Sequence, residues 1–98
     1  MSVMLEEIKN IVFPIALSYG VERVSLFGSY ARNEAHPDSD IDLCIDKGAI
    51  RDYFMLAGFQ RELEEGLGLR VDVLTTGALS KEFLSSIKNE EVELYEKQ

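Results

Sequence analysis

The pattern of apolar and polar positions predicts three helices along this chain. Apolar residues form a helical stripe in the first two stretches, as they do where one face of a helix is buried, and a cap residue indicates the third helix. Gly20 ends the first stretch, Gly66 and Gly68 end the second, and Ser80 is suited to cap the third. Pro14 interrupts the first stretch and is expected to kink that helix or split it in two. The helices are expected over residues 3–19, 51–65 and 81–88.

Four short segments outside these helices predict strands, the first of them rich in β-forming residues. The last of them alternates apolar and acidic residues and is expected at an edge of the sheet. A short helix is also expected after the first strand, capped by Ser29 and running to about Asn33. Because helices alternate with strands, we expect an α/β (α+β) fold with a small sheet, in one domain spanning residues 1–98. The strands are expected over residues 23–27, 41–45, 69–74 and 92–95.

Composition narrows the class of protein. The 98 residues carry a net charge of −8, so the chain lacks the general attraction that drives most nucleic-acid binding, and a large partner would be basic. No stretch approaches the roughly 18 consecutive apolar residues that cross a membrane. Glu6 and Glu7 stand where a secretion signal would have basic residues, so we expect no such signal. Together these two observations predict no membrane association and a cytoplasmic location. Cys44 is the only cysteine and is expected to be a small buried apolar residue.

Three aspartates lie within predicted strands or at their edges. Asp40 and Asp42 are two positions apart, so both carboxylates project from the same face of a strand. Carboxylates this close repel each other unless a cation lies between them, and oxygen ligands of this kind suit magnesium. If the strand of Asp72 neighbours theirs, the three carboxylates can hold two metal ions. Taken alone, Asp40-Ile41-Asp42 fits an exposed strand edge equally well.

A second chemical feature is the run Phe27-Gly28-Ser29 at the end of the first strand. Glycine allows a ligand to approach the backbone closely, and a helix beginning at Ser29 would present free N–H groups to phosphates. Taken alone, the run is more simply explained as a turn between a strand and a helix.

The two features together resemble the signature of a known family. Ten residues separate Phe27-Gly28-Ser29 from Asp40-Ile41-Asp42-Leu43, and an isolated strand aspartate follows thirty positions after Asp42. The runs Gly28-Ser29-Tyr30-Ala31-Arg32 and Ser39-Asp40-Ile41-Asp42-Leu43 resemble the minimal nucleotidyltransferases (MNT), a branch of the DNA polymerase beta-like nucleotidyltransferase superfamily. This resemblance spans nearly the whole chain. It implies the nucleotidyltransferase fold, in which helices flank a small mixed sheet.

The resemblance also implies a role for each residue of the two features. Gly28 and Ser29 would bind the triphosphate of ATP, the nucleotide donor. The carboxylates would ligate Mg²⁺ in a site for two metal ions, and Asp72 would in addition draw the proton from the acceptor hydroxyl. These catalytic and metal-binding residues would be Asp40, Asp42 and Asp72.

Two neighbouring residues in the turn leave more than one interpretation open. Arg32 would lie near the phosphates by the resemblance, but a surface arginine paired with Glu34 or Asp38 fits the sequence equally well. Asn33 stands where the family usually has glycine. Asparagine tolerates a left-handed backbone better than other non-glycine residues, so the turn is expected to survive this departure.

An activity and a partner follow from the same resemblance. Minimal nucleotidyltransferases are commonly encoded beside a HEPN-domain protein, typically a ribonuclease toxin, and act as its antitoxin by transferring AMP from ATP to a tyrosine. Two alternatives remain: a non-catalytic antitoxin that masks a basic ribonuclease, and a small-molecule nucleotidyltransferase. Larger members carry extra domains that bind the acceptor. We therefore expect here either a macromolecular acceptor or a site completed by a second subunit, in a homo- or hetero-oligomer.

Overall fold

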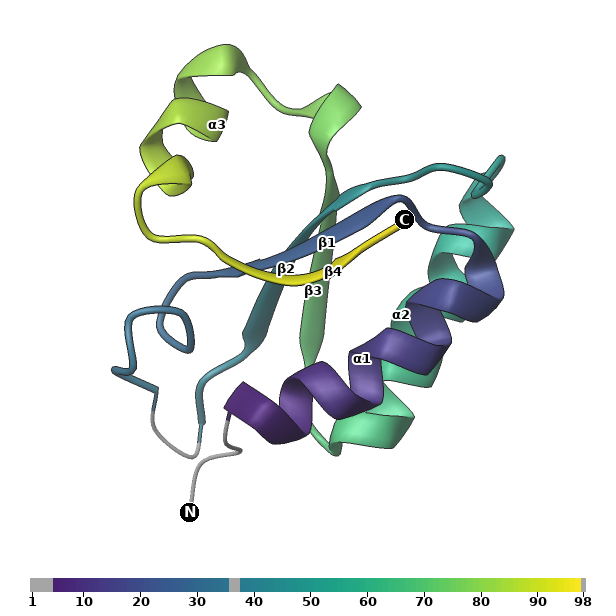
Figure 1. Ribbon diagram of the computed structural model, residues 1–98, viewed down its shortest axis with the longest axis horizontal. Helices are drawn as coiled ribbons and strands as arrows, with labels where there is room; N and C mark the ends of the chain where they lie inside the picture. Colours follow the sequence, from purple (N-terminus) through teal and green to yellow (C-terminus); the bar gives the residue numbers. More distant parts are fainter. Residues whose placement is uncertain (1–4, 36–37, 98) are drawn as a thin grey trace.

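A four-stranded mixed sheet lies at the centre of the molecule, with helices on both of its faces (Figure 1). The computed structural model describes residues 5–35 and 38–97, so residues 3 and 4 of the first expected helix lie outside the described residues. The α/β class is confirmed. In chain order the elements are α1 (Leu5–Tyr19), β1 (Arg23–Phe27), β2 (Ile41–Asp46), α2 (Tyr53–Leu67), β3 (Val71–Thr75), the 3-10 turn η1 (Thr76–Ala78), α3 (Lys81–Lys88) and β4 (Val92–Glu96).

The strands are arranged in the order β3-β2-β1-β4. β1 is antiparallel to both β2 and β4, whereas β2 and β3 are parallel, so the sheet is mixed. A parallel pair needs a crossover connection, and α2 provides it. β3 and β4 are therefore the two edge strands, which confirms the position expected for the last strand.

One face of the sheet is buried beneath α1 and α2 and contains the main core. Ile41, Leu43 and Ile45 of β2 are fully buried on this face, and they pack in one cluster with Val12 of α1 and Phe59 of α2. Successive residues of a strand point to opposite faces. The even-numbered residues of β2 therefore lie on the other face, and the sheet presents its aspartates away from the main core.

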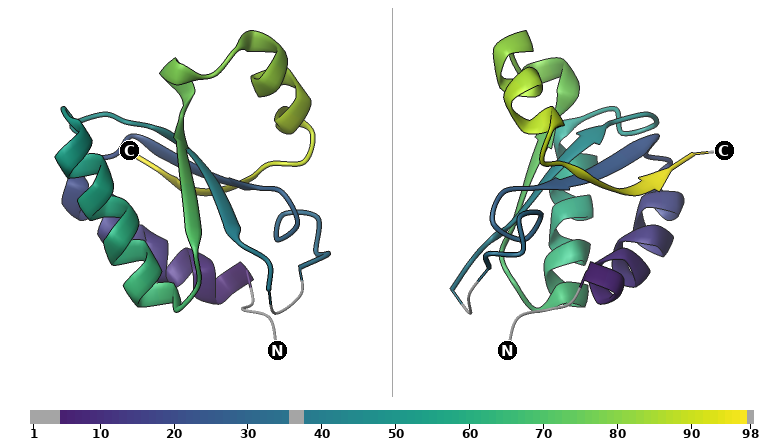
Figure 2. Two further views of the ribbon diagram at one scale, coloured as in Figure 1. Left: turned by 180° about the vertical axis from the view of Figure 1, so that it is seen from behind. Right: turned by 60° about the vertical axis from the view of Figure 1, so that its left-hand side comes forward.

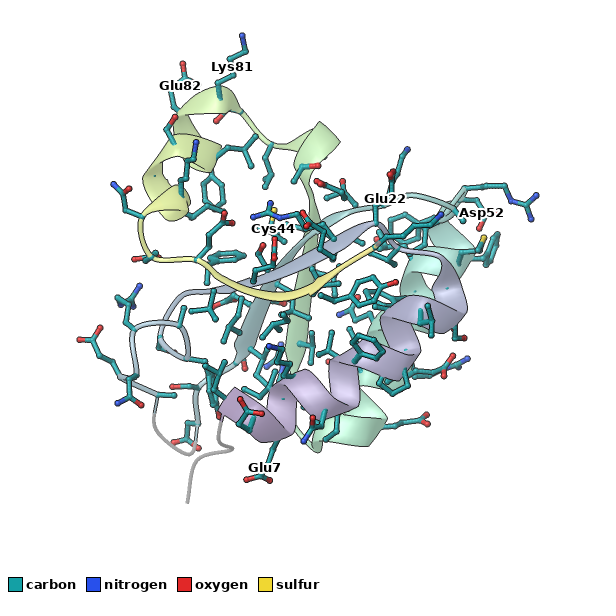
Figure 3. All side chains as sticks on the ribbon, in the orientation of Figure 1. Glu7, Glu22, Cys44, Asp52, Lys81 and Glu82 are labelled. Atoms are coloured by element: carbon teal, nitrogen blue, oxygen red, sulfur yellow. The ribbon has the colours of Figure 1, made fainter. Side chains whose placement is uncertain are left out.

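The other face is covered only in part, by α3 (Figure 2). A second and smaller apolar cluster joins α3 to the sheet, and Cys44 lies within it, between the sheet and the helix (Figure 3). Cys44 is 4% exposed, which confirms that it is a small buried residue. This cluster consists of Phe27, Cys44 and Ile87, with Leu74, Leu79 and Leu84 packed against them.

Some expected boundaries were wrong. α1 is continuous through Pro14, so the proline does not split it; the burial of Val12 and Ala16 on either side outweighs the lost hydrogen bond. α2 begins two residues later than expected because the carboxylate of Asp52 accepts a hydrogen bond from the Met55 N–H and caps the helix. No helix in the described part of the chain is long and apolar enough to cross a membrane.

No helix forms directly after Gly28 either. The backbone makes a compact turn, in which the Arg32 N–H donates to the Gly28 carbonyl at 3.1 Å and the Glu34 N–H donates to the Ser29 carbonyl at 2.8 Å. Asn33 adopts the left-handed backbone (φ +59°) and so stops the turn from continuing as a helix. The expectation that asparagine can take this conformation is confirmed.

Phe59 and Phe54 of α2 offer a matched test of the core. Phe59 is fully buried beneath the sheet, whereas Phe54 is 89% exposed on the same helix. We expect Phe59→Ala to lower the free energy of unfolding by about 3–5 kcal/mol, because it removes a large buried side chain and leaves a cavity. Phe54→Ala should change it by less than about 0.5 kcal/mol. Urea denaturation followed by circular dichroism measures both, and equal effects would contradict the packing described.

Candidate active site

The turn after β1 lies directly against the carboxylate of Asp42. Gly28 has a left-handed backbone (φ +76°), and a Cβ atom at this position would lie 2.4 Å from Oδ2 of Asp42 and 3.3 Å from its Cγ. The preceding residue, Phe27, is paired with Asp42 across the β1–β2 ladder. Only glycine satisfies both the conformation and the contact. The sequence therefore brings a polar backbone turn and a carboxylate to one point on the sheet.

Three aspartates meet beside this turn. Asp40 directly precedes β2, Asp42 is the second residue of β2, and Asp72 is the second residue of β3. The parallel pairing places Asp42 opposite Asp72 in register, so both side chains project from the face that α1 and α2 do not cover. Asp40 and Asp42 are half-buried, whereas Asp72 is exposed on the edge strand. The expected adjacency of the two strands is therefore confirmed.

The surroundings of Asp42 disfavour its charged form. Burial is the largest cause that raises the pKa of Asp42 above its usual value, and the negative charges of Asp72 and Asp40 raise it further. The positive charge of Arg32 acts in the opposite direction and lowers it. A carboxylate that is partly desolvated and repelled by two others is stabilised by a cation, so the electrostatics of this point favour cation binding.

The donor chemistry fits a divalent metal ion. The site offers carboxylate oxygens alone, which are the ligands that Mg²⁺ prefers when substrate phosphates supply the rest. Within residues 5–35 and 38–97, no three side chains of His, Cys, Asp or Glu are already arranged to hold a metal ion. Repulsion between the carboxylates opposes such closure in the protein alone. The chemistry of the carboxylates therefore suits Mg²⁺, while their side chains as placed do not form a closed set of three ligands.

Arg32 lies on the turn and is held by two carboxylates. Its Nε is 2.7 Å from Oε1 of Glu34, and its Nη1 is 3.3 Å from Oε1 of Glu90. The pairing with Glu34 agrees with the alternative that the sequence left open. Glu90 was not foreseen as a partner, because it is far away in the sequence and belongs to an acidic stretch typical of a solvated surface. Arg32 still acts on Asp42 through its charge.

Two residues of α2 fix the start of β3 and were also missed. The side-chain amide of Gln60 donates to the Val71 carbonyl at 2.8 Å, and the Val71 N–H donates to Oε2 of Glu64 at 3.0 Å. These bonds satisfy backbone groups of an edge strand one residue before Asp72. A helical pattern of apolar residues gives no signal for such contacts, because they depend on where α2 lies against the sheet.

The repulsion between the aspartates can be measured in the absence of divalent ions. Asp72→Asn should lower the pKa of Asp42, because it removes one of the negative charges that disfavour ionisation. Since a raised carboxylate pKa destabilises the fold as the pH rises, the same variant should be more stable than the wild type at neutral pH relative to acid. NMR titration of the Asp42 carboxyl carbon and urea denaturation measure the two effects.

Asp46→Asn is the matched control for this titration. Asp46 lies on β2 and on the same face as Asp42, but at the opposite end of the strand, where it accepts a hydrogen bond from the Thr76 hydroxyl. We expect this variant to leave the pKa of Asp42 unchanged. An Asp42 pKa that does not respond to Asp72→Asn would contradict the convergence of the two side chains.

Known proteins share both the sequence and the fold. A family model described as "Nucleotidyltransferase domain" matches residues 5–95. A Methanocaldococcus jannaschii protein assigned as a protein adenylyltransferase is 43% identical over 90 residues, which cover 92% of this chain and 97% of that protein. Protein adenylyltransferase MntA of Thermococcus cleftensis is 34% identical over 92 residues, which cover 90% of this chain and 93% of that protein.

Two solved structures are similar as well. One, assigned as a minimal nucleotidyltransferase, has a TM-score of 0.80 and 32% identity, and the match covers 90% of each chain. The other is described as a tri-AMPylated Shewanella oneidensis HEPN toxin in complex with MNT antitoxin. Its matching chain has a TM-score of 0.73 and 18% identity over 97% of this chain and 75% of that one. At this identity the second likeness shows a shared fold alone.

Proposed function

The chain belongs to the nucleotidyltransferase domain family and is a nucleotidyltransferase, and we propose that it is the antitoxin of a HEPN toxin, to which it transfers AMP from ATP. Relatives named as protein adenylyltransferases support this activity, and the complex of an AMPylated HEPN toxin with an MNT antitoxin supports the partner. The observation that carries the proposal is the contact of Gly28 with Asp42, beside which Asp72 lies in register. A tyrosine hydroxyl of the toxin is the proposed acceptor.

Each group of the site has a separate role in this reaction. Backbone N–H groups of Gly28 and Ser29 bind the triphosphate, and their position against Asp42 brings the α-phosphate to the carboxylates. The acceptor oxygen forms a bond to the α-phosphorus while the bond from that phosphorus to the bridging oxygen breaks, and pyrophosphate leaves. The proton of the acceptor hydroxyl passes to the carboxylate of Asp72.

The metal ligands would be the same three carboxylates. Asp40, Asp42 and Asp72 would hold Mg²⁺, which when bound neutralises charge on the phosphates and lowers the pKa of the acceptor hydroxyl. Asp72 is the exposed member and lies on an edge strand, so a hydroxyl on another protein can reach it without entering a deep pocket. This accessibility suits a macromolecular acceptor better than a small molecule.

Masking without catalysis is the second candidate. The net charge of −8 favours association with a basic ribonuclease, and masking by contact needs charge alone. It gives no reason, however, for a glycine whose missing Cβ makes room for an aspartate carboxylate. Transfer of the nucleotide explains this contact and the in-register aspartates together.

Labelled ATP, Mg²⁺ and the toxin protein test the proposal directly. We expect the wild type to transfer label to the toxin, and Asp42→Asn to lower the rate by at least about a hundredfold, because the substitution keeps the shape but removes a ligand charge. Asp46→Asn, on the same strand and face but away from Gly28, is the matched control and should retain full activity.

Measuring the inhibition of toxin activity beside the transfer of label separates the three functions. If Asp42→Asn still neutralises the toxin at full strength, masking is the function and transfer is not. If the wild type labels small hydroxyl compounds but leaves the toxin unlabelled, the enzyme modifies small molecules.

Gly28→Ala and Gly68→Ala test whether the close contact matters for activity. Both glycines have left-handed backbones, so each alanine should cost about 1–2 kcal/mol of stability, but only at Gly28 would the new Cβ collide with Asp42. Nothing lies within 4 Å of the Cβ position at Gly68. We expect Gly28→Ala to lower the transfer rate at least about tenfold beyond Gly68→Ala. Equal rates in the two variants would exclude a role for the contact.

A further inference from the structure

The backbone of Glu90 is hydrogen-bonded where the chain passes from α3 to β4. The backbone N–H groups of Glu90 and Glu91 both donate to the carbonyl of Ile87, at 3.0 Å and 2.9 Å, and the Ile87 side chain is buried. The side chain of Glu91 is ion-paired with Arg23 at 2.8 Å and is only 18% exposed. The backbone of Glu90 is therefore fixed on both sides, and its carboxylate extends from a defined point.

The guanidinium of Arg32 is paired with two carboxylates, each from a residue whose backbone N–H is hydrogen-bonded. Nη1 of Arg32 is 3.3 Å from both oxygens of Glu90, and Nε donates to Glu34, whose own backbone N–H is bonded to the Ser29 carbonyl. A guanidinium has five N–H donors in a fixed planar fork. The Nη2 group has no partner among the described residues, so one edge of the fork is left for a ligand.

Arg32 belongs to the turn that carries Gly28 and Ser29. The Arg32 N–H closes this turn on the Gly28 carbonyl at 3.1 Å, so the backbone of Arg32 is joined to the proposed phosphate-binding backbone. The charge of Arg32 is also felt at Asp42. A guanidinium is suited to bind phosphate, but a long side chain on the surface has many rotamers to lose when it is fixed.

We propose that Glu90 is a positioning residue, which together with Glu34 restrains Arg32 so that the free edge of its guanidinium binds the triphosphate. This inference rests on the proposed function. It assigns a role in nucleotide binding to a residue of the α3–β4 connection, which carries none of the sequence signature. Two carboxylates restrict the rotamers of the arginine in advance, so less entropy is lost when the nucleotide binds.

Glu90→Gln tests the proposal, with Glu93→Gln as the matched control. Both remove one negative charge near β4, but Glu93 is paired with Arg23 and does not touch Arg32. We expect Glu90→Gln to raise the Kd of the ATP analogue AMP-PNP and the KM for ATP about two- to fivefold with little change in kcat. Loss of an acidic charge should by itself strengthen the binding of a polyanion, so the sign separates positioning from general electrostatics. Calorimetry measures the Kd with Mg²⁺ present.

The double variant shows whether Glu90 acts through Arg32. In an Arg32→Ala background, Glu90→Gln should have no further effect on the Kd. An unchanged or lower Kd for Glu90→Gln alone, or an effect that persists without Arg32, would overturn the proposal. If the wild type transfers AMP to the toxin but Glu90→Gln binds the analogue normally, only this inference fails. If the binding effects are observed but no AMP is transferred, only the proposed function fails.

Discussion

The parallel pairing of β2 with β3 decides whether this sheet can act as a catalytic surface. Side chains of residues in register project from the same face, so the pairing of Asp42 with Asp72 brings carboxylates together from segments thirty residues apart. A register shifted by one residue would turn Asp72 toward the main core and leave Asp42 beside an apolar side chain. The hydrogen bond that Gln60 donates to Val71 and the one that Glu64 accepts from it hold β3 against such a shift.

β2 serves stability and chemistry with alternate residues. Its fully buried isoleucines and leucine hold the sheet to α1 and α2, while the residues between them form the site at one end and support α3 in the middle. Repulsion between the carboxylates opposes folding. The burial of apolar residues on the opposite side of the same strand offsets this repulsion, so the fold remains stable although three carboxylates lie near one another.

Much of this arrangement could be predicted from periodicity and spacing. The alternation in residues 41–45 predicted the two faces of β2, and the pattern of helices and strands predicted the fold class. Sequence reasoning failed where long-range geometry decides the outcome. The segment after Gly28 has the residues of a capped helix, but Asn33 in the left-handed conformation ends it as a turn. The partner Glu90 of Arg32 could not be found, because an ion pair between distant residues leaves no periodic trace.

The small cluster beneath α3 is separate from the main core, and this separation affects motion. A helix held by a few apolar side chains can open in a local unfolding event while the core remains intact. Opening of α3 would break the hydrogen bonds that the Glu90 and Glu91 N–H groups donate to the Ile87 carbonyl. It would thereby loosen the ion pair between Glu90 and Arg32, which lies on the turn after Gly28. The amides of α3 would then exchange with deuterium faster than those of α1 and α2. The lifetime of the ion pair between Glu90 and Arg32 would depend on the few leucine and isoleucine side chains that hold α3 to the sheet.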